Sequence, residues 1–376
     1  MSSHQYKSQH IKRHHDFFSE ECFIDDFTKH KNQNRVKEIL ETIHNDFELS
    51  IYINDADFEC ILDILDYFAA YFDDWNRYKS DLVFRSLNSK AISVLHDNYV
   101  PFRQLVVFYH MLIQKNENYN SFIFELPFIV FSLMNSENER FIDHPIESFH
   151  NISMLCFHLL IEFVINDFFV DWNGLIEVIN VFMSHICFPN IEIQRASLMA
   201  LAISLTKYPK ELSSIVLSHR SINIVFSFLS YEYNHELQNL SMSVFSSISS
   251  QNDDRLILAL LENGLLSIDL FQNRDAQFIL YSLQLIRNSL CGGEMILDYF
   301  LNPEFVISFI HLLGDTAFLI KKSVIKTLAY FMRFPKMSQF FQENPQVIDD
   351  ILDNMQFLSQ KMQRFVQFSI DGINCR

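Results

Sequence analysis

Three acidic residues at alternate positions, Asp55, Asp57 and Glu59, have the spacing of oxygen ligands in a calcium-binding loop. Such a loop needs glycine at the next position for its sharp turn, and Cys60 stands there instead. We therefore interpret the three carboxylates as surface charge. The 376-residue sequence contains none of the Gly-x-Gly-x-x-Gly, Walker, His-Glu-x-x-His or Gly-x-Ser-x-Gly motifs, so it predicts no catalytic residue and no cofactor.

Histidine and cysteine side chains give no metal-ligand set. No cysteine or carboxylate completes a spaced ligand set around the pair His14 and His15. His110 and His158 lie on or beside apolar helix faces, which is typical of hydrogen-bonded core or groove histidines. The 6 cysteines are scattered without a Cys-x-x-Cys pair, as in an intracellular protein with reduced thiols. The sequence therefore predicts no metal site.

Composition predicts a folded chain with an uneven charge. Hydrophobic residues make up 49% and charged residues 20%, while 6 Gly and 8 Pro leave few signals for the tight turns of an all-β fold. The formal net charge is −17, and residues 16–74 hold 16 acidic against 4 basic side chains. Such a field repels nucleic acid and attracts a basic partner; alternatively, it is a solvated acidic face that keeps the array soluble. The N-terminus has no signal segment and the apolar runs are too short to cross a bilayer, so a cytoplasmic or nuclear protein is expected.

The elements that must position any functional residue belong to a helical repeat with a period near 42 residues. Leu283, Ile286 and Leu290 are spaced i, i+3 and i+7, as on one face of a helix, and the pattern returns 42 positions later from Ile325. This period is typical of HEAT and armadillo arrays. Matching triples start at seven residues: Ile61, Leu105, Cys156, Leu198, Ser241, Leu283 and Ile325.

The same period predicts the domain organisation. We expect a single repeat domain over 16–376, with a loop insertion near 135–150 and a C-terminal capping unit at about 345–376. Residues 1–15 are polar, basic and rich in histidine, which is typical of a flexible tail. The serine-rich stretch 241–250 is interpreted as a helix with a polar outer face. Turns between the helices are expected at Gly174, Pro189, Pro209, Gly264, Gly292, Gly293, Asn302, Pro303, Gly314, Pro335 and Pro345.

Residues 194–334 resemble armadillo repeats, in which a short helix, a turn such as Gly264, and a second helix precede a long third helix. The end of one such helix, Leu285-Ile286-Arg287-Asn288-Ser289-Leu290, is similar to the family's Ala-Leu-x-Asn-Leu pattern. The resemblance implies an all-α, armadillo-like right-handed α-solenoid of about seven to eight helical repeats. It also implies that the third helices line a concave, peptide-binding groove.

Importin-α proteins of this family clamp a basic peptide with a ladder of tryptophans, each four residues before an asparagine on a third helix. Asn288 matches the asparagine of that ladder, while Gln284 stands at the tryptophan position. Projecting the two positions through the repeat period finds no other asparagine and no tryptophan. The candidate groove residues taken from this projection are Asp66, His110, Met199, Met242, Ser246, Gln284, Asn288, Lys326 and Tyr330.

These features predict a non-catalytic scaffold that binds a peptide or helical segment in the groove. One alternative is an importin-α-like adaptor that carries basic cargo peptides into the nucleus, and a second is a regulatory subunit of an enzyme complex. The expected partner is a protein or peptide of basic character, with no nucleic acid, membrane, metal or cofactor. The sequence leaves the oligomeric state open.

Overall fold

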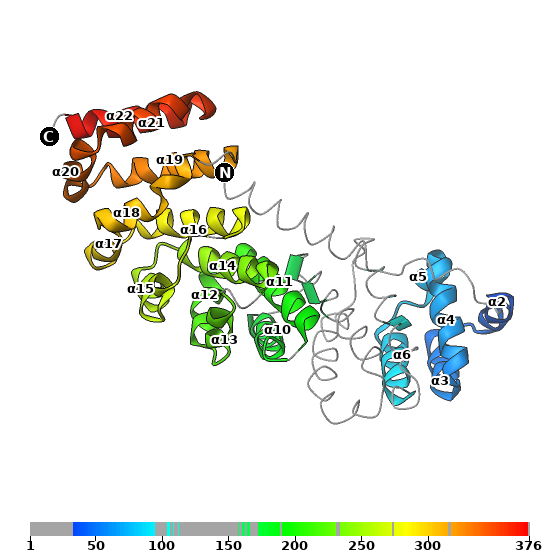
Figure 1. The fold of residues 1–376 in the computed structure, drawn as a ribbon. Helices are drawn as coiled ribbons and strands as arrows, with labels where there is room; N and C mark the ends of the chain where they lie inside the picture. The colour runs from blue at the N-terminus through cyan, green and yellow to red at the C-terminus, as the bar shows by residue number, and fades with distance from the viewer. Residues whose placement is uncertain are drawn as a thin grey trace. The chain divides into compact units, whose positions relative to one another are not determined.

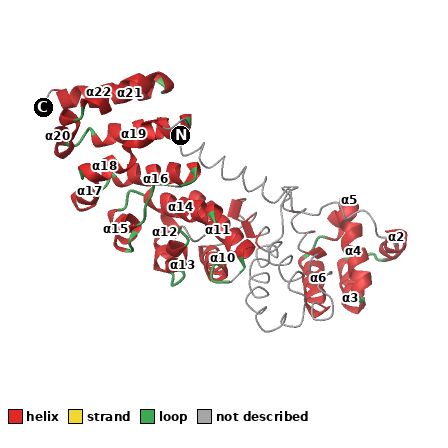
Figure 2. Cartoon of the chain, viewed as in Figure 1, coloured by secondary structure: helices red, strands yellow, loops and turns green. Residues whose placement is uncertain are grey.

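The computed structural model describes residues 33–94, 104, 105, 108, 112, 157, 160, 161, 164, 165 and 172–374, except 189, 231–233, 273 and 315–316. Regular elements in these ranges are all α-helices or short 3-10 helices, which confirms the expected all-α class (Figure 2). Within them, no single helix is long and apolar enough to cross a membrane; Glu294–Phe300 and Pro303–Gly314 would suffice together but are bent by 53°. The chain divides into two compact units, unit 1 (Met1–Ile203) and unit 2 (Ser204–Arg376).

Unit 1 has an aromatic core. Trp75 makes edge-to-face contacts with Phe68, Phe84 and Phe108, at ring-centroid distances of 5.1, 4.8 and 5.0 Å. All four rings are almost fully buried, and pairs of this geometry stabilise a core beyond their buried area. The described helices of the unit are α2 (Gln33–Thr42), α3 (Asp46–Asp55), α4 (Phe58–Ala70), α5 (Phe72–Tyr78), α6 (Asp81–Val94), α10 (Trp172–His185) and α11 (Ile191–Lys207), which continues into unit 2.

The three alternating carboxylates of the sequence lie at the junction of α3 and α4. Asp55, Asp57 and Glu59 are exposed, as expected for surface charge. Asp57 also has a capping role that the spacing does not reveal, because its Oδ1 accepts a hydrogen bond of 2.9 Å from the Cys60 N–H at the start of α4. Glu59 lies in the first turn of α4, where a negative charge favours the positive end of the helix dipole.

Unit 2 consists of four successive groups in which short helices precede a long third helix. The long helices α14, α16, α19 and α22 stack in chain order, and neighbours in this row pack on each other (Figure 1). The four groups are α12 (Pro209–Ser218), α13 (Ile222–Ser227) and α14 (His235–Ser249); α15 (Asp254–Glu262), η3 (Leu265–Ser267) and α16 (Ala276–Ser289); α17 (Glu294–Phe300), α18 (Pro303–Ile310), η4 (His311–Gly314) and α19 (Phe318–Phe331); and α20 (Pro335–Glu343), α21 (Pro345–Asn354), η5 (Met355–Phe357) and α22 (Gln360–Asn374).

The anchor triples form the core between these helices. Every anchor of the six triples that fall in described positions is buried, whereas the triple that starts at Cys156 lies outside the described residues. Full burial of one such large apolar side chain contributes roughly 1.5–3 kcal/mol. The i, i+3, i+7 spacing that predicts each helix face therefore also identifies the residues that pack between neighbouring helices. The loop insertion near 135–150 and the tail 1–15 lie outside the described residues, and the capping role of 345–376 stays a prediction.

Most turn signals lie where the sequence predicts them. Pro209, Pro303, Pro335 and Pro345 each begin a helix at a position where the missing N–H costs nothing. Gly264 follows α15 with a φ of 87°, a left-handed conformation that side chains with a Cβ rarely adopt. Two of the expectations are wrong: the turn at Gly174 and the polar outer face of the serine-rich stretch 241–250.

Gly174 lies inside α10 and is buried, so packing at this position outweighs the weak helix propensity of glycine. The serine-rich stretch forms α14, but its serines do not form a polar outer face. Small hydroxyls fit the packed interior, and some bond within their own helix, as Ser249 does by donating 2.8 Å to the Ser246 carbonyl. The buried serines are Ser241, Ser243, Ser246, Ser247 and Ser249.

Candidate functional site

A continuous set of half-buried and exposed side chains lies on two neighbouring third helices of unit 2. We call it the α16/α19 face. On α19, Phe318, Lys322, Lys326 and Tyr330 follow at intervals of four, which places them in one stripe along the helix. The full set is Gln284, Arg287 and Asn288 on α16 and Phe318, Lys322, Lys326 and Tyr330 on α19.

Asn288 links α16 to the third helix before it. Its Nδ2 donates to the Ser246 carbonyl at 3.3 Å and to Ser249 Oγ at 3.0 Å, both on α14. The side chain is half-buried, and its Oδ1 accepts no hydrogen bond from a described residue. The amide of Asn288 therefore holds two third helices together and keeps an acceptor for another molecule.

Arg287 links α16 to the following third helix. Its Nη1 donates to the Ser323 carbonyl at 3.2 Å, to Ser323 Oγ at 2.8 Å and to Thr327 Oγ1 at 2.9 Å. Burial lowers the pKa of Arg287 to about 10, so the group is still charged at neutral pH. Among the described residues, Nε and Nη2 of this guanidinium have no acceptor.

Two lysines extend the positive charge along α19. Burial lowers the pKa of Lys326 below its usual value, and the neighbouring cations Arg287 and Lys322 lower it further. Lys322 Nζ also lies 5.8 Å from the ring centroid of Phe318, which is 46% exposed. Three cations and an aromatic ring are thus close together on this face.

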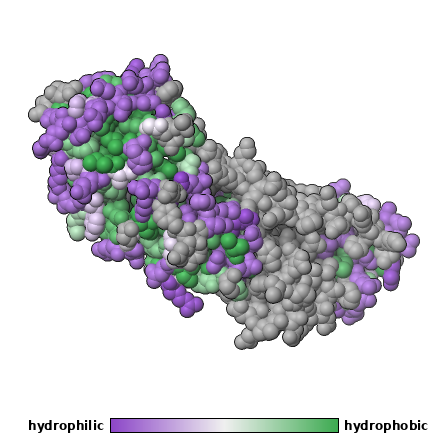
Figure 3. All heavy atoms as spheres, in the orientation of Figure 1, coloured by the Kyte–Doolittle hydropathy of each residue, from purple (hydrophilic) through white to green (hydrophobic). Residues whose placement is uncertain are grey.

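Tyr330 and Phe365 continue the contacts toward α22. Their ring centroids are 5.3 Å apart, and the Arg333 guanidinium lies 5.9 Å from the Phe365 centroid. Side chains from α14, α16, α19 and α22 are therefore connected in one series across unit 2. On the side of the unit that faces the viewer in Figure 3, hydrophobic and hydrophilic side chains lie next to one another.

The structure brings together four of the nine candidates from the sequence: Gln284, Asn288, Lys326 and Tyr330. Met242 and Ser246 are fully buried on α14, and Met199 is half-buried on α11. Asp66 is buried on α4 in unit 1, and His110 lies outside the described residues.

Sequence reasoning missed Arg287, Lys322 and Phe318. A usable signal was present for the last two, because they lie four and eight residues before Lys326, on the same face of a helix.

Charge is separated between the helices of unit 2. The third helices α14, α16, α19 and α22 carry six Lys or Arg side chains and two carboxylates. The first and second helices of the same groups carry three Lys or Arg and ten carboxylates. α16 and α19 contain no acidic residue at all. The α16/α19 face is therefore positive within a chain of net charge −17.

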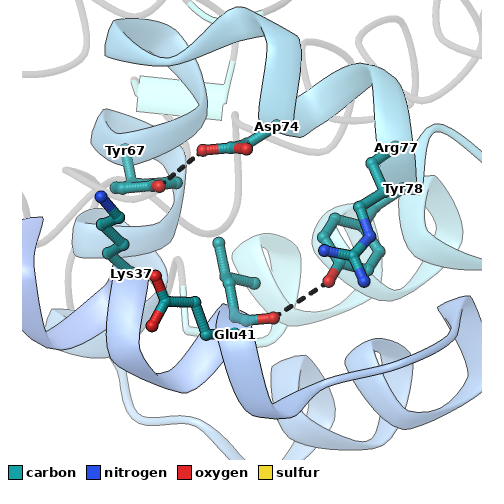
Figure 4. A pocket seen from close by; sticks show the side chains of 7 residues that line it. Lys37, Glu41, Tyr67, Asp74, Arg77 and Tyr78 are labelled. Atoms are coloured by element: carbon teal, nitrogen blue, oxygen red, sulfur yellow. Dashed lines mark hydrogen bonds between the residues drawn. The ribbon is translucent and has the colours of Figure 1, made fainter.

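Unit 1 contains a small polar pocket between α2, α4 and α5 (Figure 4). Tyr67 donates 2.6 Å to Asp74 Oδ2, and Tyr78 donates to the carbonyls of Leu40 and Ile43 at 3.0 and 2.8 Å. Burial raises the pKa of Tyr67, and the hydrogen bond to Asp74 raises it further. At about 70 Å³ the pocket has room for water but not for a peptide. We interpret its hydrogen bonds as structural.

The described residues also include no group of three or more His, Cys, Asp or Glu side chains placed to hold a metal ion.

The stacked groups of unit 2, with their long third helices, define an α-solenoid. No family model matches the sequence, and no curated protein matches it. Solved structures do match. Computationally designed armadillo repeat proteins for modular peptide recognition align with a TM-score of 0.52 and 13% identity, over 66% of this chain and 99% of theirs.

A second match is a designed armadillo repeat protein in complex with the peptide (KR)4, with a TM-score of 0.51 and 14% identity over 66% of this chain and all of that one (100%). An engineered protein aligns over 90% of this chain and 77% of its own length, with a TM-score of 0.50 and 14% identity. The chain therefore has an armadillo-like helical fold, as the sequence predicts.

Proposed function

We propose that this protein is a non-catalytic scaffold that binds a peptide segment of another protein on the α16/α19 face. The observation that supports this most directly is the series of hydrogen bonds through Asn288 and Arg287. These bonds fix the side chains of consecutive third helices before any partner arrives. A surface held in its binding conformation loses less entropy on association.

The groups left over on this face suit peptide recognition. Asn288 Oδ1 can accept from a peptide N–H, and the half-exposed amide of Gln284 can both donate and accept. Helical repeats commonly present such extended surfaces, because each group contacts only its neighbours. The designed armadillo proteins with similar fold include one that holds a peptide, which is consistent with this role.

The nuclear-import adaptor for basic peptides has weaker support. One structural neighbour is a complex with (KR)4, and the excess of acidic residues in 16–74 would attract a basic partner to unit 1. On the α16/α19 face, however, Arg287, Lys322 and Lys326 would repel lysine and arginine side chains. We retain the cytoplasmic or nuclear location as an expectation, which imaging of a fluorescent fusion of the chain tests.

Photo-crosslinking in cells tests the proposed surface. A photoreactive amino acid placed at Gln284 or at Lys326 should capture a partner protein reproducibly. The same probe at Glu262 or Glu304, which are exposed on α15 and α18, is the matched control and should capture none. Equal capture from all four positions, or capture from the controls alone, would show that binding does not use the third helices.

A further inference from the structure

We infer that the α16/α19 face binds an acidic peptide segment that carries a large apolar side chain next to its carboxylates. This inference rests on the proposed function and adds the chemical class of the partner. It replaces, for unit 2, the basic partner that the total charge of the chain suggests.

The positive charge of the α16/α19 face is not compensated by any described carboxylate. Arg287, Lys322 and Lys326 lie close together, and neither α16 nor α19 has a carboxylate. No described acidic residue forms an ion pair with any of the three. The ion pairs between described residues involve other side chains. Three neighbouring cations repel one another, and bringing carboxylates to them relieves that repulsion. An acidic ligand therefore gains more here than on a neutral surface.

The geometry of Arg287 also suits a carboxylate ligand. Its Nη1 is directed by three hydrogen bonds to Ser323 and Thr327, which fixes the plane of the guanidinium. Nε and Nη2, the edge that remains, point two parallel donors in one direction. That edge matches the two oxygens of a carboxylate, which is the strongest form of this contact. The serine and threonine oxygens hold the arginine in place without neutralising it.

Exposed apolar side chains lie beside the cations. Phe318 is 46% exposed and the adjacent Leu319 is 60% exposed, at the beginning of α19. Lys322 separates Phe318 from Lys326 along one stripe of the helix. A segment whose carboxylates reach Lys322 and Lys326 can thus cover Phe318 with an aromatic or long aliphatic side chain.

Nucleic acid fits this surface less well than a peptide. Its phosphates continue far beyond a patch of three cations. The first and second helices of unit 2 carry ten carboxylates, and the whole chain carries −17. The net negative charge of the chain would repel a long polyanion more strongly than a short acidic segment.

Fluorescence anisotropy with the full chain tests the inference. The probes are a short labelled peptide that alternates Asp or Glu with Phe and Leu, the same peptide with Lys in place of every acid, and the same peptide with Gln there. A labelled single-stranded oligonucleotide is the fourth probe. We expect the acidic peptide to bind most tightly and to weaken as salt increases.

Charge reversal at the face identifies the site. Lys322→Glu with Lys326→Glu should reduce acidic-peptide affinity by roughly tenfold or more. Lys210→Glu is the matched control, because Lys210 is exposed on α12 and makes no ion pair given by the described residues; it should change affinity by less than about twofold. The neutral double variant Lys322→Gln, Lys326→Gln should lose an intermediate amount of affinity for the acidic peptide. This milder pair replaces the charge reversal in the test if the charge-reversed variant does not fold.

The outcomes separate this inference from the proposed function. Preferential binding of the Lys or Gln peptide, or of the oligonucleotide, would overturn the acidic partner. The same holds if the acidic peptide binds equally well to the charge-reversed variant. In each of those cases, capture at Gln284 in cells would still support a scaffold. If the probe at Gln284 captures no partner in cells and none of the peptides binds, the proposed scaffold function itself is overturned.

Discussion

Asn288 is expected to stabilise unit 2 even when no partner is bound. Replacing it by alanine removes the hydrogen bonds to the Ser246 carbonyl and to Ser249 Oγ, at 3.3 and 3.0 Å. A typical buried hydrogen bond contributes about 0.5–1.5 kcal/mol, and the longer of these two belongs at the low end. Asn288→Ala should therefore lower the free energy of unfolding of unit 2 by about 1–2 kcal/mol. For a unit of this size, that corresponds to a decrease of about 2–8 °C in melting temperature.

Hydrogen exchange measured on the intact chain is the most direct assay, because stacked helical groups need not unfold in a single step. Protection should fall in the C-terminal half of α14 and in α16. Gln284→Ala is the matched control. It lies one turn earlier on the same helix, is half-exposed and makes no hydrogen bond given by the described residues. It should change stability by less than about 0.5 kcal/mol.

A double-mutant cycle with Ser249→Ala isolates the contact itself. The two substitutions should be coupled by about 0.5–1.5 kcal/mol, because both remove the same hydrogen bond. The structural role of Asn288 would be refuted if the free-energy changes of the two substitutions were strictly additive. It would also be refuted if Asn288→Ala left the hydrogen-exchange protection of α14 and α16 unchanged. Asn288 would then act only toward a partner.

Three further predictions concern other contacts. Thr327→Val, which keeps shape but removes an acceptor of Arg287 Nη1, should cost about 1–2 kcal/mol in chemical denaturation followed by circular dichroism. Gly264→Ala should cost roughly 1–2 kcal/mol in the same assay, because φ is 87° at this turn, and a Gly314→Ala control should cost less. Burial holds the pKa of His185 below its usual 6.5, so the unfolded chain binds the proton more readily and stability should fall as pH decreases below about 6.5. Urea unfolding followed by tryptophan fluorescence, to which Trp172 on the same helix as His185 contributes together with Trp75, should show this slope, and His185→Gln should flatten it.

The repeat and its helix boundaries could be predicted because they depend on local spacing. Leu283, Ile286 and Leu290 face one side of any α-helix, whatever surrounds it, and that side has to be buried. Proline at the first position of a helix and glycine with positive φ act just as locally, as Pro303 and Gly264 show. Gly174 is different, since its helical conformation depends on packing that no local signal encodes.

The candidate surface could be predicted only in part. Projecting Asn288 backward by one period gives Ser246, on the assumption that all third helices expose the same side. α14 does not, because Met242 and Ser246 are fully buried. The charge of the surface could not be predicted for a related reason. A sum over residues 16–74 gives the sign for a stretch of sequence, whereas the sign of a surface depends on which helices contribute to it.

Two polar residues of the α16/α19 face use some atoms to hold neighbouring helices together and keep other atoms for contact with a partner. Asn288 uses Nδ2 toward α14 and Arg287 uses Nη1 toward α19, while Oδ1 of the first and the Nε and Nη2 edge of the second form no bond to a described residue. A side chain tied at one atom has already lost most of its rotamer freedom, so its second contact costs less entropy. If Thr327→Val loosens Arg287, affinity for the acidic peptide should therefore fall although Thr327 is buried beneath the face. An unchanged affinity in that variant would mean that the guanidinium does not need its anchor to bind.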